Sequence, residues 1–503
     1  MTGFNERIVR IVPRLLAAVF CGAFSFPAFA QVVGGGDAPA GTPGSTVSAK
    51  AAGLGEGRGF SLSEDGNSRL HLRFDTGAGF DTNPYSLNFE SNFGANGGAF
   101  NGDVPVRMRP GLELDMPGNV FALTLESSAD LGAYPGAFNP GIFTGWFDEN
   151  ADQGTRQLSL IKINNNIDIE VNRDGMFSFA LGDSFNFSRD PQVLSFAVGN
   201  VLSNSLRMGG GFRPGGGALS IKGDASFDLA VYIPCEGVAI LGCPTKDTTN
   251  NDDFNSGGLR ANLRADYRFL PRTGFFAEFS AGAHGYLNTL TGTGSQPYTV
   301  PLHLRVGAKG QFSSKLSGLA SIGYDLPLIF DSGFNLGLAS TFAGGVNLGN
   351  VGQVTAFNAQ IEARWRISHS IKLSGGFQRT VMPTPVFQYR IPNKLYVSYQ
   401  QAIGTFLTVT ANAELALVQY GADINAGTPN SVVDTNSENG FLSLEPSMKF
   451  GVAYHIFDWM SVGINNNFIY HSGLGMQSKA TTGGTGEVDF VRNETLVMLS
   501  IHY

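Results

Sequence analysis

Basic side chains recur at even spacing in several segments of the chain, and their chemistry is the recognition of charge. In the segment 259–269, Arg260, Arg264 and Arg268 alternate with apolar residues. Guanidinium groups pair with carboxylates and attract anions, but they do not by themselves make or break bonds. The basic residues that fall on such polar positions are Arg73, Arg107, Arg109, Arg260, Arg264, Arg268, Arg305, Lys309, Arg364 and Arg366.

Catalytic and metal-binding patterns are missing from the sequence. No G-x-S-x-G, H-E-x-x-H or G-x-x-x-x-G-K-[ST] segment occurs, and the 7 histidines are scattered. His471 is the one loose candidate for a hydrolase, and its simpler interpretation is a polar residue near a loop. We therefore predict no enzyme activity, no cofactor and no metal site. The net charge of −8 also argues against a nucleic-acid partner.

Two of the three cysteines lie close together, in Pro-Cys-Glu-Gly-Val-Ala-Ile-Leu-Gly-Cys-Pro, as Cys235 and Cys243. In an oxidising compartment such a close pair is expected to form a disulfide across a loop. Two free thiols are the alternative. A zinc site is a poor fit, because no histidine lies near the pair.

The elements that must position these residues are β-strands. From about residue 69 to the end, apolar and polar residues alternate with a period of two, as in 259–269, 302–309 and 442–456. About eighteen such segments are present, and many run ten residues or more. Strands of that length suit a bilayer better than a soluble sandwich, whose strands usually run about five or six residues.

The connections between these segments alternate between short and long. The eight short ones contain turn residues, as in Pro117-Gly118, Arg173-Asp174-Gly175 and Phe457-Asp458. The nine long ones, such as 131–155 and 326–352, are rich in Asn, Gly, Ser and Thr. Strict alternation places all short turns at one rim of a closed antiparallel sheet, and both chain ends at that same rim.

The start of the chain has the composition of an export signal. Arg7, Arg10 and Arg14 precede a short apolar stretch that ends in Ala28-Phe29-Ala30. We predict a signal peptide over 1–30, a flexible Gly/Pro/Ala leader over 31–67 and a transmembrane barrel over 68–503. A membrane anchor is the alternative for the first segment, but its apolar stretch is short for that role.

The overall composition excludes the commoner classes of protein. Only 15% of residues are charged, 67 are glycine and 40 are phenylalanine, while the mean hydropathy is near zero. A bundle of transmembrane helices needs apolar runs that this chain lacks. A sheet with one apolar and one polar face explains the cancelling average, with the phenylalanines facing lipid. Tyr85, Trp146, Phe269, Trp365, Trp459 and Tyr503 are expected near the membrane interfaces.

The last strand carries alternating apolar residues and a terminal aromatic, namely Val497, Leu499, Ile501 and Tyr503. This pattern resembles the C-terminal signal of the bacterial outer-membrane β-barrel (porin-like) family, which the barrel-assembly machinery reads. With the strand count and the alternating connections, the resemblance predicts an all-β, transmembrane, antiparallel up-and-down barrel of about 18 strands with both termini periplasmic. The signal peptide predicts export by the general secretory route, and the resemblance implies contact with outer-membrane lipid and lipopolysaccharide.

The resemblance further implies a porin-like channel for passive diffusion of small hydrophilic solutes. The alternative is a barrel component of a multi-protein envelope machine, for polysaccharide export, surface motility or adhesion, with periplasmic envelope proteins as partners. On the polar faces the basic residues outnumber the carboxylates, ten to five; the carboxylates are Asp75, Glu113, Asp115, Asp266 and Glu362. That excess predicts a preference for anions, unless the charges pair across strands.

Overall fold

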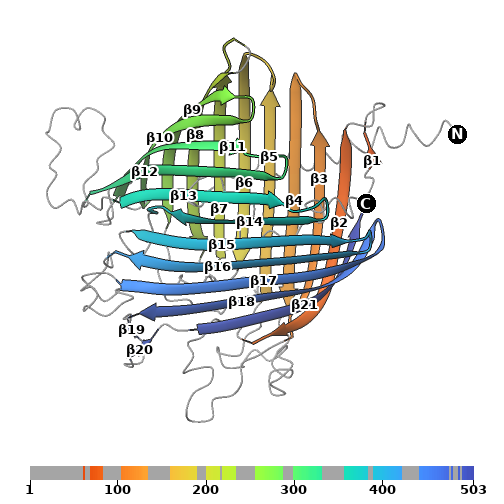
Figure 1. Cartoon of the computed structure of the whole chain (residues 1–503). Helices are drawn as coiled ribbons and strands as arrows, with labels where there is room; N and C mark the ends of the chain where they lie inside the picture. The colour runs from red at the N-terminus through yellow and green to blue at the C-terminus, as the bar shows by residue number, and fades with distance from the viewer. Residues whose placement is uncertain are drawn as a thin grey trace.

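The computed structural model is a closed antiparallel barrel of long strands (Figure 1). It describes residues 60–62, 68–82, 104–133, 159–189, 200–215, 218–233, 255–286, 298–330, 356–382, 389–421, 441–474, 477–479, 485–487 and 490–503. The main sheet has 19 strands, of which β1 (Phe60–Ser61) is a two-residue addition, so 18 strands form the wall. Among the described residues, no helix is long and apolar enough to cross a membrane.

The wall follows chain order, with each strand paired to the next. Its first half comprises β2 (Arg69–Asp81), β3 (Val106–Met116), β4 (Phe121–Ala133), β5 (Ser159–Val171), β6 (Phe177–Arg189), β7 (Asn200–Phe212), β8 (Leu219–Ile233), β9 (Ser256–Leu270) and β10 (Thr273–Tyr286). Its second half comprises β11 (Tyr298–Gln311), β12 (Leu316–Phe330), β13 (Ala356–Arg366), β14 (Ile371–Arg379), β15 (Arg390–Ile403), β16 (Leu407–Tyr420), β17 (Phe441–Phe457), β18 (Met460–Leu474) and β21 (Phe490–His502). A separate hairpin joins β19 (Gln477–Lys479) to β20 (Thr485–Glu487).

Pairing between the first and last wall strands closes the sheet. β2 runs antiparallel to β21, with Phe74 opposite Ile501 and Asp81 opposite Glu494. The last residue takes part as well, because Leu72 and Tyr503 exchange backbone hydrogen bonds of 2.8 Å. The closed sheet leaves no unpaired edge, which is the condition for a sheet to cross a lipid bilayer. Strands of 9 to 17 residues match the length that crossing requires.

All eight short connections lie where the sequence predicts them. They join β3 to β4, β5 to β6, β7 to β8, β9 to β10, β11 to β12, β13 to β14, β15 to β16, and β17 to β18. Three depend on left-handed backbone: Asn172 has φ of 53° and donates its side-chain amide to the Phe177 carbonyl at 2.6 Å, Gly215 has φ of 58°, and Gly404 has φ of 59°. The chain enters β2 and leaves β21 at this same rim, because Arg69 pairs with Asp115 beside the first short connection.

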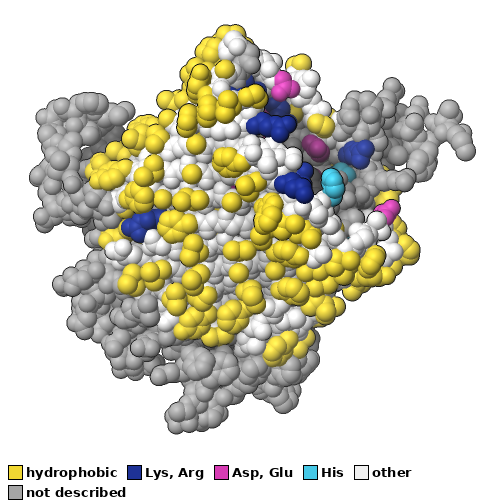
Figure 2. All heavy atoms as spheres, viewed as in Figure 1, with side chains coloured by type: hydrophobic (Ala, Val, Ile, Leu, Met, Phe, Trp, Pro, Cys, Tyr) yellow, Lys and Arg dark blue, Asp and Glu magenta, His cyan; other side chains and the backbone are white. Residues whose placement is uncertain are grey.

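The outer face of the wall is apolar, and the phenylalanines concentrate there. Figure 2 shows hydrophobic side chains over most of the visible face of the sheet. Aromatic pairs gather near the short connections, including Phe269–Phe275 with ring centroids 4.6 Å apart and Phe457–Trp459 at 5.4 Å. Phe269, Trp365, Trp459 and Tyr503 lie at this level as predicted, whereas Tyr85 and Trp146 lie outside the described residues. Such a belt is typical of a membrane interface.

Candidate functional site in the barrel lumen

The inner face of the wall carries the polar residues that alternate with the exposed apolar ones. On β9, Leu259, Leu263 and Tyr267 are more than half exposed on the outer face. Arg260 and Arg264 lie between them in sequence and therefore point to the inside. The same alternation and the strand registers place all ten predicted basic residues on the inner face.

Most of those basic residues are paired with carboxylates. The pairs with a predicted basic residue are Arg73–Asp75, Arg107–Asp130, Arg107–Glu494, Arg109–Asp130, Arg264–Asp266, Arg264–Glu278, Arg305–Glu278, Lys309–Asp266 and Arg364–Glu362. Arg260, Arg268 and Arg366 have no ion pair with a described residue. The alternative in which charges pair across strands thus describes five of the ten, and two more, Arg73 and Arg364, pair with a carboxylate on their own strand.

One group of paired charges joins three neighbouring strands, and we call it the Glu278 cluster. Glu278 on β10 accepts from Arg264 on β9 at 3.1 Å and from Arg305 on β11 at 2.8 Å. Arg305 also donates to Gln360 on β13 at 3.0 Å, and Arg264 pairs with Asp266 at 3.2 Å. The Arg264, Arg305 and Glu278 side chains are only 13–18% exposed, so water screens these pairs less than it screens surface pairs.

An aromatic ring supports the Glu278 cluster. The Arg264 guanidinium carbon lies 4.2 Å from the centre of the Phe276 ring, and that of Arg305 lies at 5.9 Å. Phe276 is 4% exposed and shares the inner face with Glu278, so it departs from the prediction that the phenylalanines face lipid. Its ring fits because Gly307 is opposite, where an added Cβ would lie 2.6 Å from the ring. The ring holds both guanidinium planes by cation–π attraction.

A second group of charges lies where the barrel closes, and we call it the closure cluster. Asp81 on β2 is fully buried and accepts from both Nε and Nη2 of Arg492 on β21, at 3.0 and 2.8 Å. Next to this pair, Glu494 contacts Arg107 on β3, which also reaches Asp130 on β4 at 3.5 Å. Charge-assisted pairs therefore link four strands, including both ends of the wall.

A third buried carboxylate, Asp325 on β12, gathers donors from its neighbours. It contacts Nδ1 of His303 at 2.8 Å and the backbone N–H of Val381 at 3.0 Å, and Asn358 also donates to it. Asp325 is fully buried, as Asp81 is. Buried carboxylates with several donors rigidify the wall around them.

The sequence prediction missed the carboxylates that balance the lumen. Besides the five predicted ones, the inner face carries Asp81, Glu126, Asp130, Asp168, Glu170, Asp224, Asp228, Glu278, Asp325, Glu414, Glu445 and Glu494. It also carries further basic residues, namely Arg69, Lys162, Arg207, Lys222, Lys372, Arg390, Lys394, Lys449 and Arg492. Together with the predicted residues, the described inner face carries 17 carboxylates (5 predicted and 12 missed) and 19 basic residues (10 predicted and 9 further), so the two signs are nearly balanced. Assigning to the inner face every strand position that alternates with an outer apolar residue would have identified these carboxylates, since all lie within predicted strands or beside their ends.

The two signs are nevertheless spread unevenly around the wall. Carboxylates predominate on β4 to β8, where Asp168, Asp224 and Asp228 lie. Basic residues predominate on β9 to β14, which carry Arg260, Arg268 and Arg366, the three without an ion pair to a described residue. A polar solute in the lumen would therefore experience a field directed across the barrel.

The geometry around His471 does not form a hydrolase site. His471 lies on the inner face of β18 and is 1% exposed, whereas a phospholipase would need it on the lipid face. Ser443 and Glu445 both approach the same ring nitrogen, Nδ1, at 3.3 and 3.5 Å. An imidazole in a catalytic triad relays a proton between partners on its two different nitrogens, so these two contacts at Nδ1 do not form a triad. The described part of the chain also contains no cluster of His, Cys, Asp or Glu suited to a metal ion.

Some of the remaining predicted sites lie within the described residues and others lie outside them. Val497, Leu499, Ile501 and Tyr503 share the outer face of β21, where Val497 and Tyr503 are about half exposed. Their use as an assembly signal stays a prediction. Cys235 and Cys243 lie outside the described residues, as do the predicted signal peptide and most of the leader. The leader interval also contains β1, which pairs with the start of β2.

Comparisons with known proteins find barrels of similar architecture. No family model matches the chain, and no curated protein does. Among solved structures, the apoprotein form of the FrpB iron transporter from Neisseria meningitidis is 8% identical, with 86% of this chain and 81% of that chain covered and a TM-score of 0.44. OccAB2 from Acinetobacter baumannii is 10% identical, with 87% of this chain and 98% of that chain covered and a TM-score of 0.40. The siderophore receptor PirA from Acinetobacter baumannii is 9% identical, with 87% of this chain and 80% of that chain covered and a TM-score of 0.41. At such identities and scores, function has to be argued from the lumen itself.

Proposed function

We propose that this protein is an outer-membrane channel through which small hydrophilic solutes diffuse passively. One observation carries the proposal: a closed wall of 18 strands has an apolar outer face and a charged inner face. Barrels of about eight strands fill their interior with side chains, whereas sixteen to eighteen strands leave room for water. The wall strands place the Glu278 cluster and the closure cluster along that interior, so both would line the path of a solute.

The proposal includes an orientation and a route to the membrane. Both ends of the wall lie at the rim of the short connections, and in bacterial barrels the short turns face the periplasm. We therefore place both termini in the periplasm, after export by the general secretory route. Val497, Leu499, Ile501 and Tyr503 would be read there by the barrel-assembly machinery. A channel of this kind needs no cofactor and performs no catalysis.

Ion preference is the finer part of the proposal. Because seven of the ten predicted basic residues are paired, the lumen as a whole is close to neutral. Arg260, Arg268 and Arg366 would then supply a modest attraction for anions along one wall. This is weaker than the preference expected from an excess of ten basic residues over five acidic ones.

Swelling of proteoliposomes in isotonic sugar solutions tests the proposed function. Vesicles that contain the purified barrel should swell at rates that fall with the size of the sugar, as for an aqueous pore of fixed width. No swelling above that of protein-free vesicles, together with periplasmic proteins that copurify in fixed ratio, would instead support a component of an envelope machine. That alternative is favoured by no specific contact in the described residues.

A further inference from the structure

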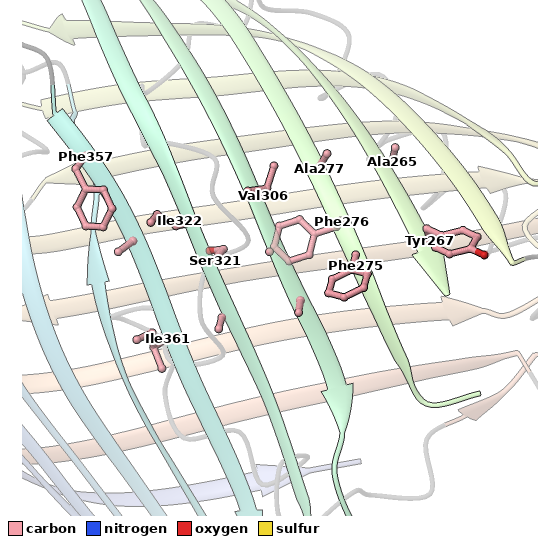
Figure 3. Close-up of a pocket in the computed structure, with 14 residues that line it drawn as sticks. Ala265, Tyr267, Phe275, Phe276, Ala277, Val306, Ser321, Ile322, Phe357 and Ile361 are labelled. Atoms are coloured by element: carbon pink, nitrogen blue, oxygen red, sulfur yellow. The ribbon is translucent and has the colours of Figure 1, made fainter. Parts of the chain in front are cut away.

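An apolar groove crosses the outer face of the wall from β9 to β13 (Figure 3). Its volume is about 800 Å³. The strand registers bring small residues side by side along its floor, Ala265 beside Ala277 and Ala308 beside Ala320. Larger residues form its walls, namely Tyr267, Phe275, Val306, Ile322, Phe357 and Ile361. The floor is recessed because alanine side chains are short, so the groove has the chemistry and shape to take an extended hydrocarbon chain.

A guanidinium group lies next to this groove on the same face. Arg379, the last residue of β14, pairs in register with Ala359 of the groove, so its side chain belongs to the outer face. Its Nε donates to the carbonyl of Phe357, a wall residue, at 3.0 Å, and its Nη1 donates to Asn393 at 2.5 Å. No described carboxylate lies within ion-pair distance of it. Its positive charge is therefore not neutralised by the described part of the chain.

This position is unusual for a basic residue. Among strand residues whose side chains the structure describes, Arg379 is the one Lys or Arg on the outer face. A charge on the lipid face costs about 2–4 kcal/mol at the bilayer midplane but only about 0–1 kcal/mol near the interface. Arg379 ends β14 on the side away from the short connections, and its guanidinium reaches the level of Phe357, nearer that rim. At that level a guanidinium contacts lipid headgroups, and it binds phosphate with two parallel hydrogen bonds.

We propose that the groove and Arg379 together bind a phosphorylated glycolipid, with an acyl chain in the groove and a phosphate on the guanidinium. The proposal rests on the orientation given above, in which the rim of Arg379 faces outward. Lipopolysaccharide is the lipid of that leaflet that carries phosphate on an acylated sugar. Asn393 and the Phe357 carbonyl hold the guanidinium in place before the lipid arrives, which lowers the cost of binding.

Native mass spectrometry of the purified full-length barrel tests this site. The added probes are truncated lipopolysaccharide with its phosphates, the same lipid after dephosphorylation, and phosphatidylglycerol. Arg379→Leu should weaken retention of the phosphorylated lipid about tenfold, the loss expected for one charge-assisted contact. Ala308→Trp fills the groove and should weaken retention of both the phosphorylated and the dephosphorylated lipid.

Two matched variants control for general effects. Arg272→Leu removes a cation from the short connection between β9 and β10, at the opposite rim, and Ala411→Trp enlarges an outer-face alanine of β16 outside the groove. Both should retain lipid as the wild type does, and each variant is first shown to be folded by its heat-dependent mobility on gels. Equal retention by Arg379→Leu and the wild type would overturn the proposal, as would preferential retention of phosphatidylglycerol. Sugar-driven swelling is measured on the same samples, so failure of the channel function and failure of the lipid site are separate results.

Discussion

Replacing Glu278 by glutamine would remove one negative charge from the lumen wall while keeping the size of the side chain. Glu278 is the shared acceptor of Arg264 and Arg305, at 3.1 and 2.8 Å. The variant would leave Arg264 with Asp266 as its carboxylate partner among the described ion pairs, and Arg305 with the Gln360 side-chain oxygen. We expect the lumen to become more attractive to anions, because the positive charge on β9 and β11 is then less compensated.

The size of this effect follows from Coulomb's law. A permeating ion at about 6 Å from the added net charge gains or loses roughly 0.7 kcal/mol in water. Screening at about 0.1 M salt leaves roughly 0.4 kcal/mol, a factor of about two in local concentration for each sign of ion. The anion-to-cation permeability ratio should therefore rise by up to about fourfold.

The assay is the reversal potential of a single barrel in a planar bilayer under a salt gradient. Glu278→Gln should shift it towards the anion potential, and the shift should shrink at high salt. Asp174→Asn, on the short connection between β5 and β6, removes the same charge outside the lumen and should leave the potential unchanged. An unchanged potential in Glu278→Gln, or a shift towards cations, would refute the assignment of the Glu278 cluster to the conducting path.

Three further predictions concern the charged inner wall. Arg492→Leu removes the guanidinium that donates two hydrogen bonds to the fully buried Asp81. The free energy of unfolding should fall by about 3–5 kcal/mol, so the folded band on heat-modifiability gels should convert at a lower temperature, and Arg492→Lys should lose less. Conversion of Arg492→Leu at the wild-type temperature would show that the closure cluster does not stabilise the barrel. Phe276→Leu removes the ring beneath Arg264 and should lower the free energy of unfolding by about 1 kcal/mol, measured by the denaturant midpoint, and no change would mean that the ring does not hold the guanidinium. Replacing Arg260, Arg268 and Arg366 together by glutamine should lower the anion-to-cation permeability ratio, measured as the reversal potential in a salt gradient. An unaltered reversal potential would exclude these three residues as the source of the anion preference.

The architecture was accessible from the sequence because a barrel strand is a local pattern. Period-two alternation and turn residues located all eight short connections, and strand ends agree closely, as for the alternating segment 442–456 against Phe441–Phe457. Closure was implied by the C-terminal strand, and β2 does pair with β21. These features depend on residues within about a dozen positions of each other.

The arrangement of charges was less accessible because it depends on strand register. Arg107 and Glu494 are 387 positions apart, and only closure of the barrel brings them together. Phe276 follows Phe275 in sequence, so an apolar pattern alone does not say which of the two rings faces inward. Register settles the question, because Phe276 lies opposite Gly307 and shares a face with Glu278. The predicted excess of ten basic residues over five acidic ones shrinks to near balance for a different reason, since the prediction counted residues on the clearest strands alone.

Single-channel conductance in a planar bilayer tests the central claim most directly. The purified barrel should insert in discrete steps of stable, equal conductance that scales with the conductivity of the bathing salt, as for an open aqueous lumen. Insertion of folded barrel, shown by heat-modifiability, without any conductance step would contradict the account of the inner wall as a path for solutes.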